Sequence, residues 1–338
     1  MLGDGEEIYG SPLFFQRRTV RKIFTTYEEQ IKTLKEKRLI IVDEPSLRNN
    51  LKEIGYYNLI NGYGEIFYYA KDWYCRTATD KDIYNLYLFD KNLRNITYNY
   101  ALRLESKIKA IVCHIFSKYN GEDHRKYIAP ESFDKDISKK ARIEKLLKRC
   151  WQIIQKGTEA KSNTRRRYLV HYMQSHGYVP LWVLARAMTL GDISVFYSSM
   201  KPNEKFEISS EFNVKPKHFE IMLKMLVAYR NIVAHDERIF NVKLYNDHLP
   251  DTLSIYNKLK TPRSDTGLPM HGRKDFFALI IIFKYLLTPF DFASFWHAFE
   301  NEFRALQTQI KSHFIEKIKG SMGLVGAWWE LKDFYMEE

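Results

Sequence analysis

Residues 82–119, DIYNLYLFDKNLRNITYNYALRLESKIKAIVCHIFSKY, decide the fold class of this chain. Apolar side chains recur in the stretch at spacings of three and four residues; they are Leu86, Phe89, Leu93, Ile96, Tyr100, Leu104, Ile108, Ile111 and Ile115. That period places them near one face of an α-helix. Gly121 follows and is expected to end the helix. The stretch therefore predicts one long amphipathic helix.

The rest of the chain also favours helices. With only 15 glycines and 10 prolines among 338 residues, it is poor in the residues that punctuate β structure. Helical spacing or a helix-start residue indicates further helices at 27–42, from Ser46 to Gly55, at 141–155, from Pro180, from about Lys217, at 275–287 and at 291–318. No segment alternates convincingly between polar and apolar residues, as a half-buried strand would. We therefore expect an all-α fold.

The helical patterns divide the chain into three parts. Residues 1–80 form an N-terminal helical region rich in aromatic residues, residues 81–245 a helical domain, and residues 246–338 a C-terminal helical extension. The aromatic run at 56–74, YYNLINGYGEIFYYAKDWY, has two interpretations. Its rings either pack into a core, which is the commoner outcome at helical spacing, or stack on exposed nucleic-acid bases.

Positive charge is concentrated in one segment. The chain has a formal net charge of +12, and residues 135–167 contain 12 Lys or Arg against three acidic residues, a local net of +9. Such density suits a phosphate backbone, although a solvated face or a membrane surface could also account for it. We expect RNA contacts here from Lys139, Lys140, Arg142, Lys145, Lys148, Arg149, Arg165, Arg166 and Arg167.

Several classes of protein are excluded by what the sequence lacks. The three cysteines are far apart and odd in number, which favours a reducing compartment over a disulfide framework. Residues 1–18 lack the pattern of a signal peptide, and the longest apolar run, at 276–283, is too short to cross a bilayer. No metal-ligand spacing and no nucleotide-binding loop stands out. We expect a cytoplasmic protein without membrane contact, metal or small-molecule cofactor.

A polar, titratable segment ends an otherwise apolar helix at residues 228–241, AYRNIVAHDERIFN. Arg230 falls in the middle of the apolar stripe of this helix, while Asn231 and His235 share another face, and Arg230 and His235 point about 140° apart. An arginine on a burying face is costly unless an anion meets it. Either the helix frays before His235, or a second copy in a twofold dimer completes one pocket. Alternatively, Arg230 pairs with a buried carboxylate such as Glu105, and His235 merely ends the helix.

The same segment resembles a known family. RNIVAH, residues 230–235, matches the R-[N/H/D]-x-x-x-H motif of the HEPN ribonuclease superfamily. Together with 51–63 (LKEIGYYNLINGY), 93–112 (LRNITYNYALRLESKIKAIV) and 180–197 (PLWVLARAMTLGDISVFY), it resembles the abortive-infection branch of that superfamily, the Abi-D/Abi-F-like phage-defence proteins. The resemblance covers about residues 25 to 245, and the last ninety residues carry no similar motif.

The resemblance implies a HEPN-type helical bundle that dimerises through the motif-bearing helix and cleaves RNA without a metal. It implies catalytic roles for Arg230, Asn231 and His235. Histidine ordinarily has a pKa near 6.5, so it can act as a general base or a general acid at neutral pH. We expect attack by the RNA 2′-hydroxyl and 2′,3′-cyclic phosphate products. Glu105 and Asp236 are supporting candidates.

The implied partners are RNA and a second copy of the chain. Beyond the RNA substrate, a small structured noncoding RNA could bind the basic segment as antitoxin or guide, which would place the protein in a toxin–antitoxin or antiviral system. Two other interpretations stay open. In one, the chain is an RNA-binding scaffold that uses the same dimer without catalysis; in the other, it is a protein-interaction module in which Arg230 and His235 are structural.

Overall fold

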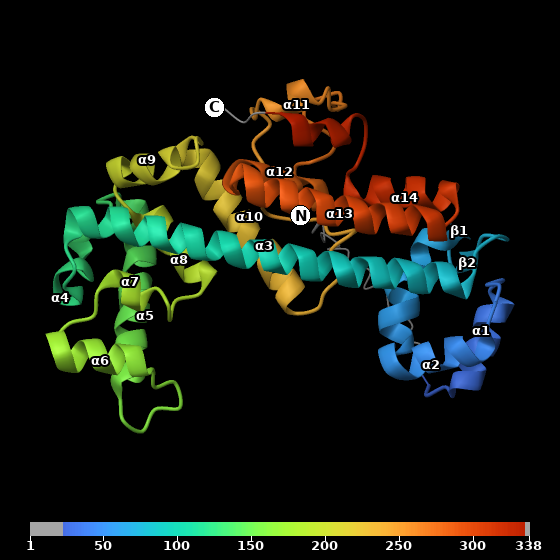
Figure 1. Ribbon diagram of the computed structural model, residues 1–338, viewed down its shortest axis with the longest axis horizontal. Coiled ribbons are helices and arrows are strands. Elements are labelled where there is room, and N and C mark those ends of the chain that lie inside the picture. The colour runs from blue at the N-terminus through green and yellow to red at the C-terminus, as the bar shows by residue number, and fades with distance from the viewer. Residues whose placement is uncertain (1–22, 335–338) are drawn as a thin grey trace, which may run out of the picture.

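The computed structural model describes residues 23–334. The prediction about a signal peptide therefore falls on residues outside the described range, as do the outer ends of the N-terminal and C-terminal parts. Within the described range the chain is a bundle of helices with one two-stranded hairpin (Figure 1). The prediction of an all-α fold is confirmed.

The long helix that the sequence predicts is α3, Asp80–Asn120. Thr79 caps its start by accepting a hydrogen bond from the backbone N–H of Asp82, whose carboxylate in turn accepts one from the backbone N–H of Thr79. Gly121 ends it with a φ of +76°, which a residue with a side chain rarely adopts. With 41 residues, α3 extends for roughly 60 Å. It crosses the whole molecule and contacts helices from every other part of the chain (Figure 1).

The N-terminal part covers one end of α3. Its elements are α1 (Tyr27–Glu36), α2 (Glu44–Ile54), the π-helix η1 (Tyr57–Asn61), the 3₁₀-helix η2 (Gly64–Phe67), and strands β1 (Tyr68–Ala70) and β2 (Trp73–Tyr74). The helix expected at 27–42 ends six residues early, because Arg38 has a φ of +70° and Ile40 then pairs with Thr79 in a β-bridge. The next helix is capped by the Asp43 carboxylate, not by Ser46, and ends at Gly55 as expected.

A second group of helices covers the other end of α3. It comprises α4 (His124–Tyr127), η3 (Pro130–Ser132), η4 (Ile137–Lys139), α5 (Lys140–Thr158), α6 (Arg167–His176), α7 (Leu181–Leu184), α8 (Leu190–Ser199) and α9 (Pro202–Ser210). Phe116 of α3 anchors the group through close ring contacts to Tyr127, Phe133 and Phe196.

Helix α10, Pro216–Ala234, crosses α3 and carries the motif. The elements that follow are α11 (Ile255–Lys258), α12 (Phe276–Leu286), α13 (Pro289–Gln309), α14 (Ser312–Met322) and η5 (Trp328–Asp333). Among them, α13 packs against α3 and α12 against α10, while α14 contacts η2 and η5 contacts α12. The single helix expected at 291–318 is instead two helices, because Ile310 and Lys311 adopt extended backbone angles between α13 and α14. Phe295 of α13 packs edge-on against Tyr100 of α3, so the C-terminal extension shares the core of the central domain.

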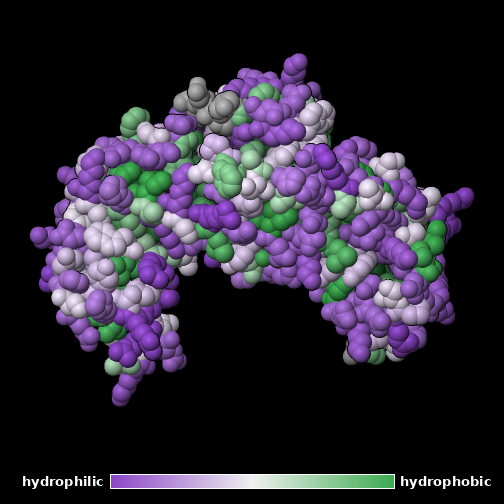
Figure 2. Space-filling model, in the orientation of Figure 1, coloured by the Kyte–Doolittle hydropathy of each residue, from purple (hydrophilic) through white to green (hydrophobic). Residues whose placement is uncertain are grey.

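The molecule has the outline of an arch (Figures 1 and 2). The helix α3 and the C-terminal helices form the span, α1 and α2 form one lobe, and α5 and α6 lie in the other. The C-terminal end of α10 emerges on the concave side, between the two lobes. None of the helices in residues 23–334 combines the length and the apolar composition that crossing a bilayer requires.

The shared core predicts that the C-terminal extension does not unfold on its own. Phe295 is fully buried where α13 meets α3, so Phe295→Ala should lower the free energy of unfolding by about 3–5 kcal/mol, in one transition seen alike by far-UV circular dichroism and tryptophan fluorescence. Phe290→Ala, on the same helix with a 78% exposed side chain, should change it by less than about 0.5 kcal/mol. A separate early transition in Phe295→Ala would instead make the extension an independent domain.

Candidate functional site

The motif sits where α10 ends. His235 is the C-cap of the helix and is exposed. The next residue, Asp236, has a φ of +58°, and the backbone N–H groups of Asp236 and Glu237 donate to the carbonyl groups of Val233 and Ile232. This is the Schellman pattern of a helix C-terminus, with an aspartate in the position that usually holds glycine. The helix therefore ends before His235, as one of the alternatives from the sequence required.

His235 lines a pocket of about 600 Å³. Three separate segments form its walls: the end of α2 with η1, two residues of α3, and the chain after α10. The lining residues are Glu53, Ile54, Tyr57, Asn58, Asn61, Gly62, Tyr63, Tyr87, Arg94, His235, Asp236, Glu237, Arg238 and Asn241. Most are polar or aromatic.

A buried ion pair on α3 organises this pocket. Asp90 is fully buried, and its carboxylate accepts hydrogen bonds from Arg94, from the Tyr63 hydroxyl at 2.8 Å, and from the backbone N–H groups of Ile239 and Phe240 at 3.1 and 2.8 Å. Because these donors come from three separate segments, one carboxylate holds the chain after His235 against α3 and η1.

Two arginines, Arg94 and Arg238, line the pocket. The side chain of Arg94 is buried, with only 4% of its surface exposed. Its Nη1 donates to Asp90 and to Tyr63, and its Nε lies 2.9 Å from Oδ1 of Asp236. Burial acts to lower the pKa of Arg94, but Asp90, Tyr63 and Asp236 together raise it, so the group keeps its charge. Burial also raises the pKa of Tyr63, which keeps its hydroxyl a donor.

The structure does not bring all the predicted site residues together. His235 and Asp236 line the pocket, whereas Arg230, Asn231 and Glu105 do not. The Nε of Arg230 lies 3.5 Å from Oε2 of Glu105, and its guanidinium lies 6.0 Å from the centre of the Tyr98 ring. Neither Arg230 Nε nor Glu105 Oε2 forms a hydrogen bond within residues 23–334. The pairing with Glu105 that the sequence suggested is therefore present, and Arg230 faces α3 rather than His235.

Glu105 and Asn231 have distinct surroundings. The other oxygen of Glu105 lies 2.8 Å from the Lys109 ammonium, so the carboxylate bridges two cations. Asn231 is exposed, one turn before His235 on α10. Asn231 and His235 thus share an exposed face of the helix end, as predicted, while the guanidinium of the same motif lies against the core.

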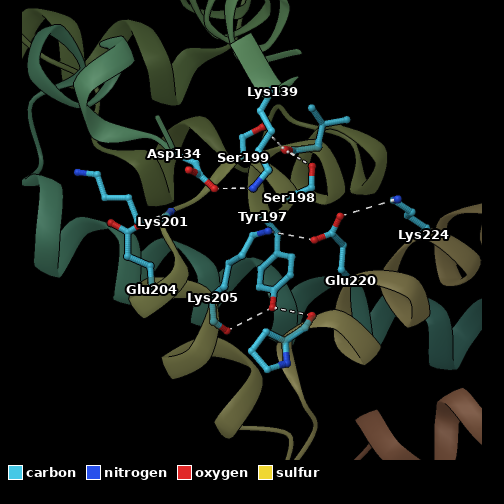
Figure 3. Close-up of polar contacts among 12 residues, drawn as sticks. Asp134, Lys139, Tyr197, Ser198, Ser199, Lys201, Glu204, Lys205, Glu220 and Lys224 are labelled. Carbon is cyan, nitrogen blue, oxygen red and sulfur yellow. Dashed lines mark hydrogen bonds and ion pairs between the residues drawn. The ribbon is translucent and has the colours of Figure 1, made fainter. Parts of the chain in front are cut away.

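The basic segment occupies the opposite lobe from the pocket's tyrosines (Figure 1). Exposed basic side chains on α5 and just before α6 include Lys140, Arg142, Lys145, Lys148, Arg149, Arg165, Arg166 and Arg167. Lys139 is only half-exposed, since its ammonium pairs with Asp134 (Figure 3). It borders a second hollow of about 510 Å³, where Glu220 pairs with Lys205 at 3.0 Å and lies 3.8 Å from Lys224. The segment therefore presents most of its charge to solvent.

The aromatic run at 56–74 divides between the two interpretations. Tyr63, Phe67 and Tyr74 are buried, so packing accounts for them. Tyr57 is 74% exposed and lines the pocket, and Tyr69 is 58% exposed outside it. Asp90 and Arg94 were not predicted as site residues from the sequence. Two charged residues four positions apart, within the apolar pattern of 82–119, are the signal that could have identified them. No group of three or more His, Cys, Asp and Glu within residues 23–334 could hold a metal ion.

The left-handed conformation of Asp236 gives a test of the helix end. Asp236→Gly and Asp236→Ala both lose the contact with Arg94, but only Asp236→Gly also removes the cost of a side chain at positive φ. The free energy of unfolding in urea should therefore be about 1 kcal/mol higher for Asp236→Gly than for Asp236→Ala. Equal stabilities would show that this residue is not held at positive φ in solution.

Comparison with known proteins places the chain in a family. The family model described as Abi-like protein matches residues 49–241, which is more than half of the chain. The matched range includes every residue that lines the pocket, from Glu53 to Asn241. No curated protein and no solved structure matches significantly. The match supports the family level of the resemblance, while the HEPN superfamily and the Abi-D/Abi-F branch stay predictions. The chain therefore belongs to the Abi-like protein family, which suggests a role in abortive infection.

Proposed function

We propose that this protein is a metal-independent endoribonuclease of a phage-defence system and that His235 is its principal catalytic residue. The observation that carries the proposal is the exposed imidazole at the end of α10, in a pocket whose wall holds a buried guanidinium. A histidine and an arginine beside one phosphodiester provide proton transfer and charge stabilisation, which are the needs of a reaction whose nucleophile, the 2′-hydroxyl, belongs to the substrate.

In the proposed reaction, the imidazole of His235 takes the proton of the 2′-hydroxyl, and the oxygen attacks the adjacent phosphorus. The bond to the 5′-oxygen breaks, and that oxygen takes up a proton from the imidazolium of His235 in a second copy of the chain or from solvent. The products are a 2′,3′-cyclic phosphate and a 5′-hydroxyl. Arg94 is placed to stabilise the growing charge on the phosphate, because its charge is kept inside the wall of the pocket.

In this proposal, Arg230 and Asn231 contribute to cleavage when a second copy of the chain forms a twofold dimer at the end of α10. The last turn of α10 exposes Asn231, Ala234 and His235, so a twofold axis near this turn would appose two imidazoles. Arg230 then holds phosphate after exchanging its 3.5 Å contact with Glu105 for a shorter one to RNA. Lys109 remains to neutralise Glu105 when this happens.

The basic lobe would hold the RNA away from the site of cleavage. The solvent side of α5 carries a continuous positive stripe. Three exposed residues form it, within about 100° around the helix axis: Lys145, Lys148 and Arg149. The two lobes flank the concave side of the arch (Figure 2). A structured noncoding RNA, acting as antitoxin or guide, would use the same stripe.

Cleavage should depend on His235. In His235→Ala, cyclic-phosphate products from a mixed cellular RNA should fall by at least about 100-fold, since a general acid–base residue typically contributes about 10²–10⁴ in rate. Arg230→Ala should cause a comparable loss while the protein stays folded, because Lys109 still compensates Glu105. His297→Ala removes an exposed histidine of α13 and should cleave normally. Full activity in His235→Ala would refute the nuclease, and RNA binding with no cleavage by any variant would favour the scaffold.

Binding of RNA should depend on α5. The double variant Lys145→Gln, Lys148→Gln should bind RNA more weakly, and the slope of log affinity against log salt should become shallower by about 0.7 for each lost phosphate contact with single-stranded RNA. The control Lys32→Gln, Lys52→Gln removes the same charge from exposed positions on α1 and α2. An equal loss of affinity in both variants would indicate a net-charge effect and would remove the assignment to the basic segment.

A further inference from the structure

The walls of the His235 pocket contain more recognition chemistry than phosphate binding needs. One wall is η1, Tyr57–Asn61, a single turn of π-helix. Such turns are rare and occur frequently at functional sites. This one presents Tyr57, Asn58 and Asn61 to the pocket in five consecutive residues, and all three are exposed.

Tyr57 has the features of a stacking platform. Its side chain is 74% exposed although it lines a pocket, and it makes no ring contact with another aromatic residue in the described part of the chain. The neighbouring rings of the same run, Tyr63, Phe67 and Tyr74, are all buried. The core therefore does not account for the exposed ring, whereas an aromatic face open to a pocket suits a planar base.

The two asparagines supply hydrogen-bonding groups beside that ring. Asn58 donates one hydrogen bond to the carbonyl of Ile54 at 3.1 Å, which leaves its amide oxygen as an acceptor for a ligand. Asn61 offers both a donor and an acceptor. Amide side chains of this kind pair with the edge of an unpaired base, which carries donors and acceptors in a fixed pattern.

The opposite part of the pocket provides for a phosphate. The contacts of the Arg94 guanidinium within residues 23–334 use Nε and Nη1, so its Nη2 remains for a phosphate oxygen. Arg238 donates to the carbonyl of Gly62 and lies 6.0 Å from the centre of the Tyr63 ring, which fixes η1 to the chain after His235. Arg238 thus links the wall that carries Tyr57 and the asparagines to the chain after His235.

We propose that this pocket binds one unpaired nucleotide of the RNA, with its base stacked on Tyr57, the edge of the base paired with Asn58 and Asn61, and its phosphate held by Arg94. The inference rests on the proposed function. The inference adds specificity to the proposed nuclease, because the pocket selects the nucleotide next to the cleaved bond. This nucleotide must leave any duplex before it can enter the pocket. The volume of about 600 Å³ lies within the range of small-ligand sites and accommodates a nucleotide.

The test is a binding measurement that does not require cleavage. In the His235→Ala background, Tyr57→Ala should bind a labelled single-stranded oligonucleotide about 5- to 150-fold more weakly, the loss expected for one stacked base. Tyr57→Phe retains the ring and should stay within about twofold. Tyr69→Ala, from the same aromatic run but outside the pocket, should bind as the background does. Binding of a fully paired RNA duplex should be the same with and without Tyr57→Ala.

The outcomes separate this inference from the nuclease itself. If His235→Ala binds the oligonucleotide and Tyr57→Ala binds it equally well, the nucleotide pocket is wrong and the proposed nuclease stands. An equal loss with duplex RNA would show a general effect on the protein and would also overturn the pocket. If His235→Ala binds no RNA and the unmodified chain cleaves none, both proposals fail. A changed base preference at the cleaved position in Asn61→Ala, read by sequencing products from a randomised RNA, would support the assignment of the edge contacts.

Discussion

The carboxylate of Asp90 is the constraint on which the candidate site depends. A buried charge in a helix core is costly, and here the cost is offset by an arginine one turn away, a tyrosine hydroxyl and two backbone N–H groups. These partners belong to the turn between η1 and η2, to α3 and to the chain that follows the motif. The same network that satisfies the charge therefore sets the position of the loop that carries His235, and it keeps Arg94 charged in the wall of the pocket.

The strain at the end of α10 fits this arrangement. Asp236 adopts a positive φ that glycine would adopt more easily, and its carboxylate contacts Arg94 at 2.9 Å. Glycine could not make that contact. The residue thus accepts a less favourable backbone conformation while it couples the motif to the buried arginine, and strain of this kind is typically found at functional sites.

Much of the fold could be predicted from the sequence, because long amphipathic helices leave an unmistakable period. The helical period and Gly121 predict α3 to within two residues at each end. The break between α13 and α14 was missed because the apolar spacing continues across Ile310, and spacing carries no information on a local change of backbone angles. The short hairpin of β1 and β2 has too few residues to show alternation.

The candidate site was predictable only in part, because its residues converge through tertiary contacts. His235 and its motif can be found from the sequence, and the pairing of Arg230 with Glu105 was among the alternatives. That Arg94, rather than Arg230, shares the pocket with His235 could not be deduced, since it depends on how α10 crosses α3. The division of the aromatic run into buried rings and the exposed Tyr57 likewise depends on packing that no single segment determines.

The separation of charge along α3 has a kinetic consequence. Arg94, in the wall of the pocket, and Phe116, which packs on Phe196 of α8 in the other lobe, are 22 positions apart on this helix, or roughly 33 Å. A long polyanion approaching from solution is steered by the field of the basic lobe, so its first encounter occurs well away from the imidazole. In the proposed nuclease, capture rate and turnover would then be set by different ends of the molecule, and ionic strength would change the capture rate far more than the turnover.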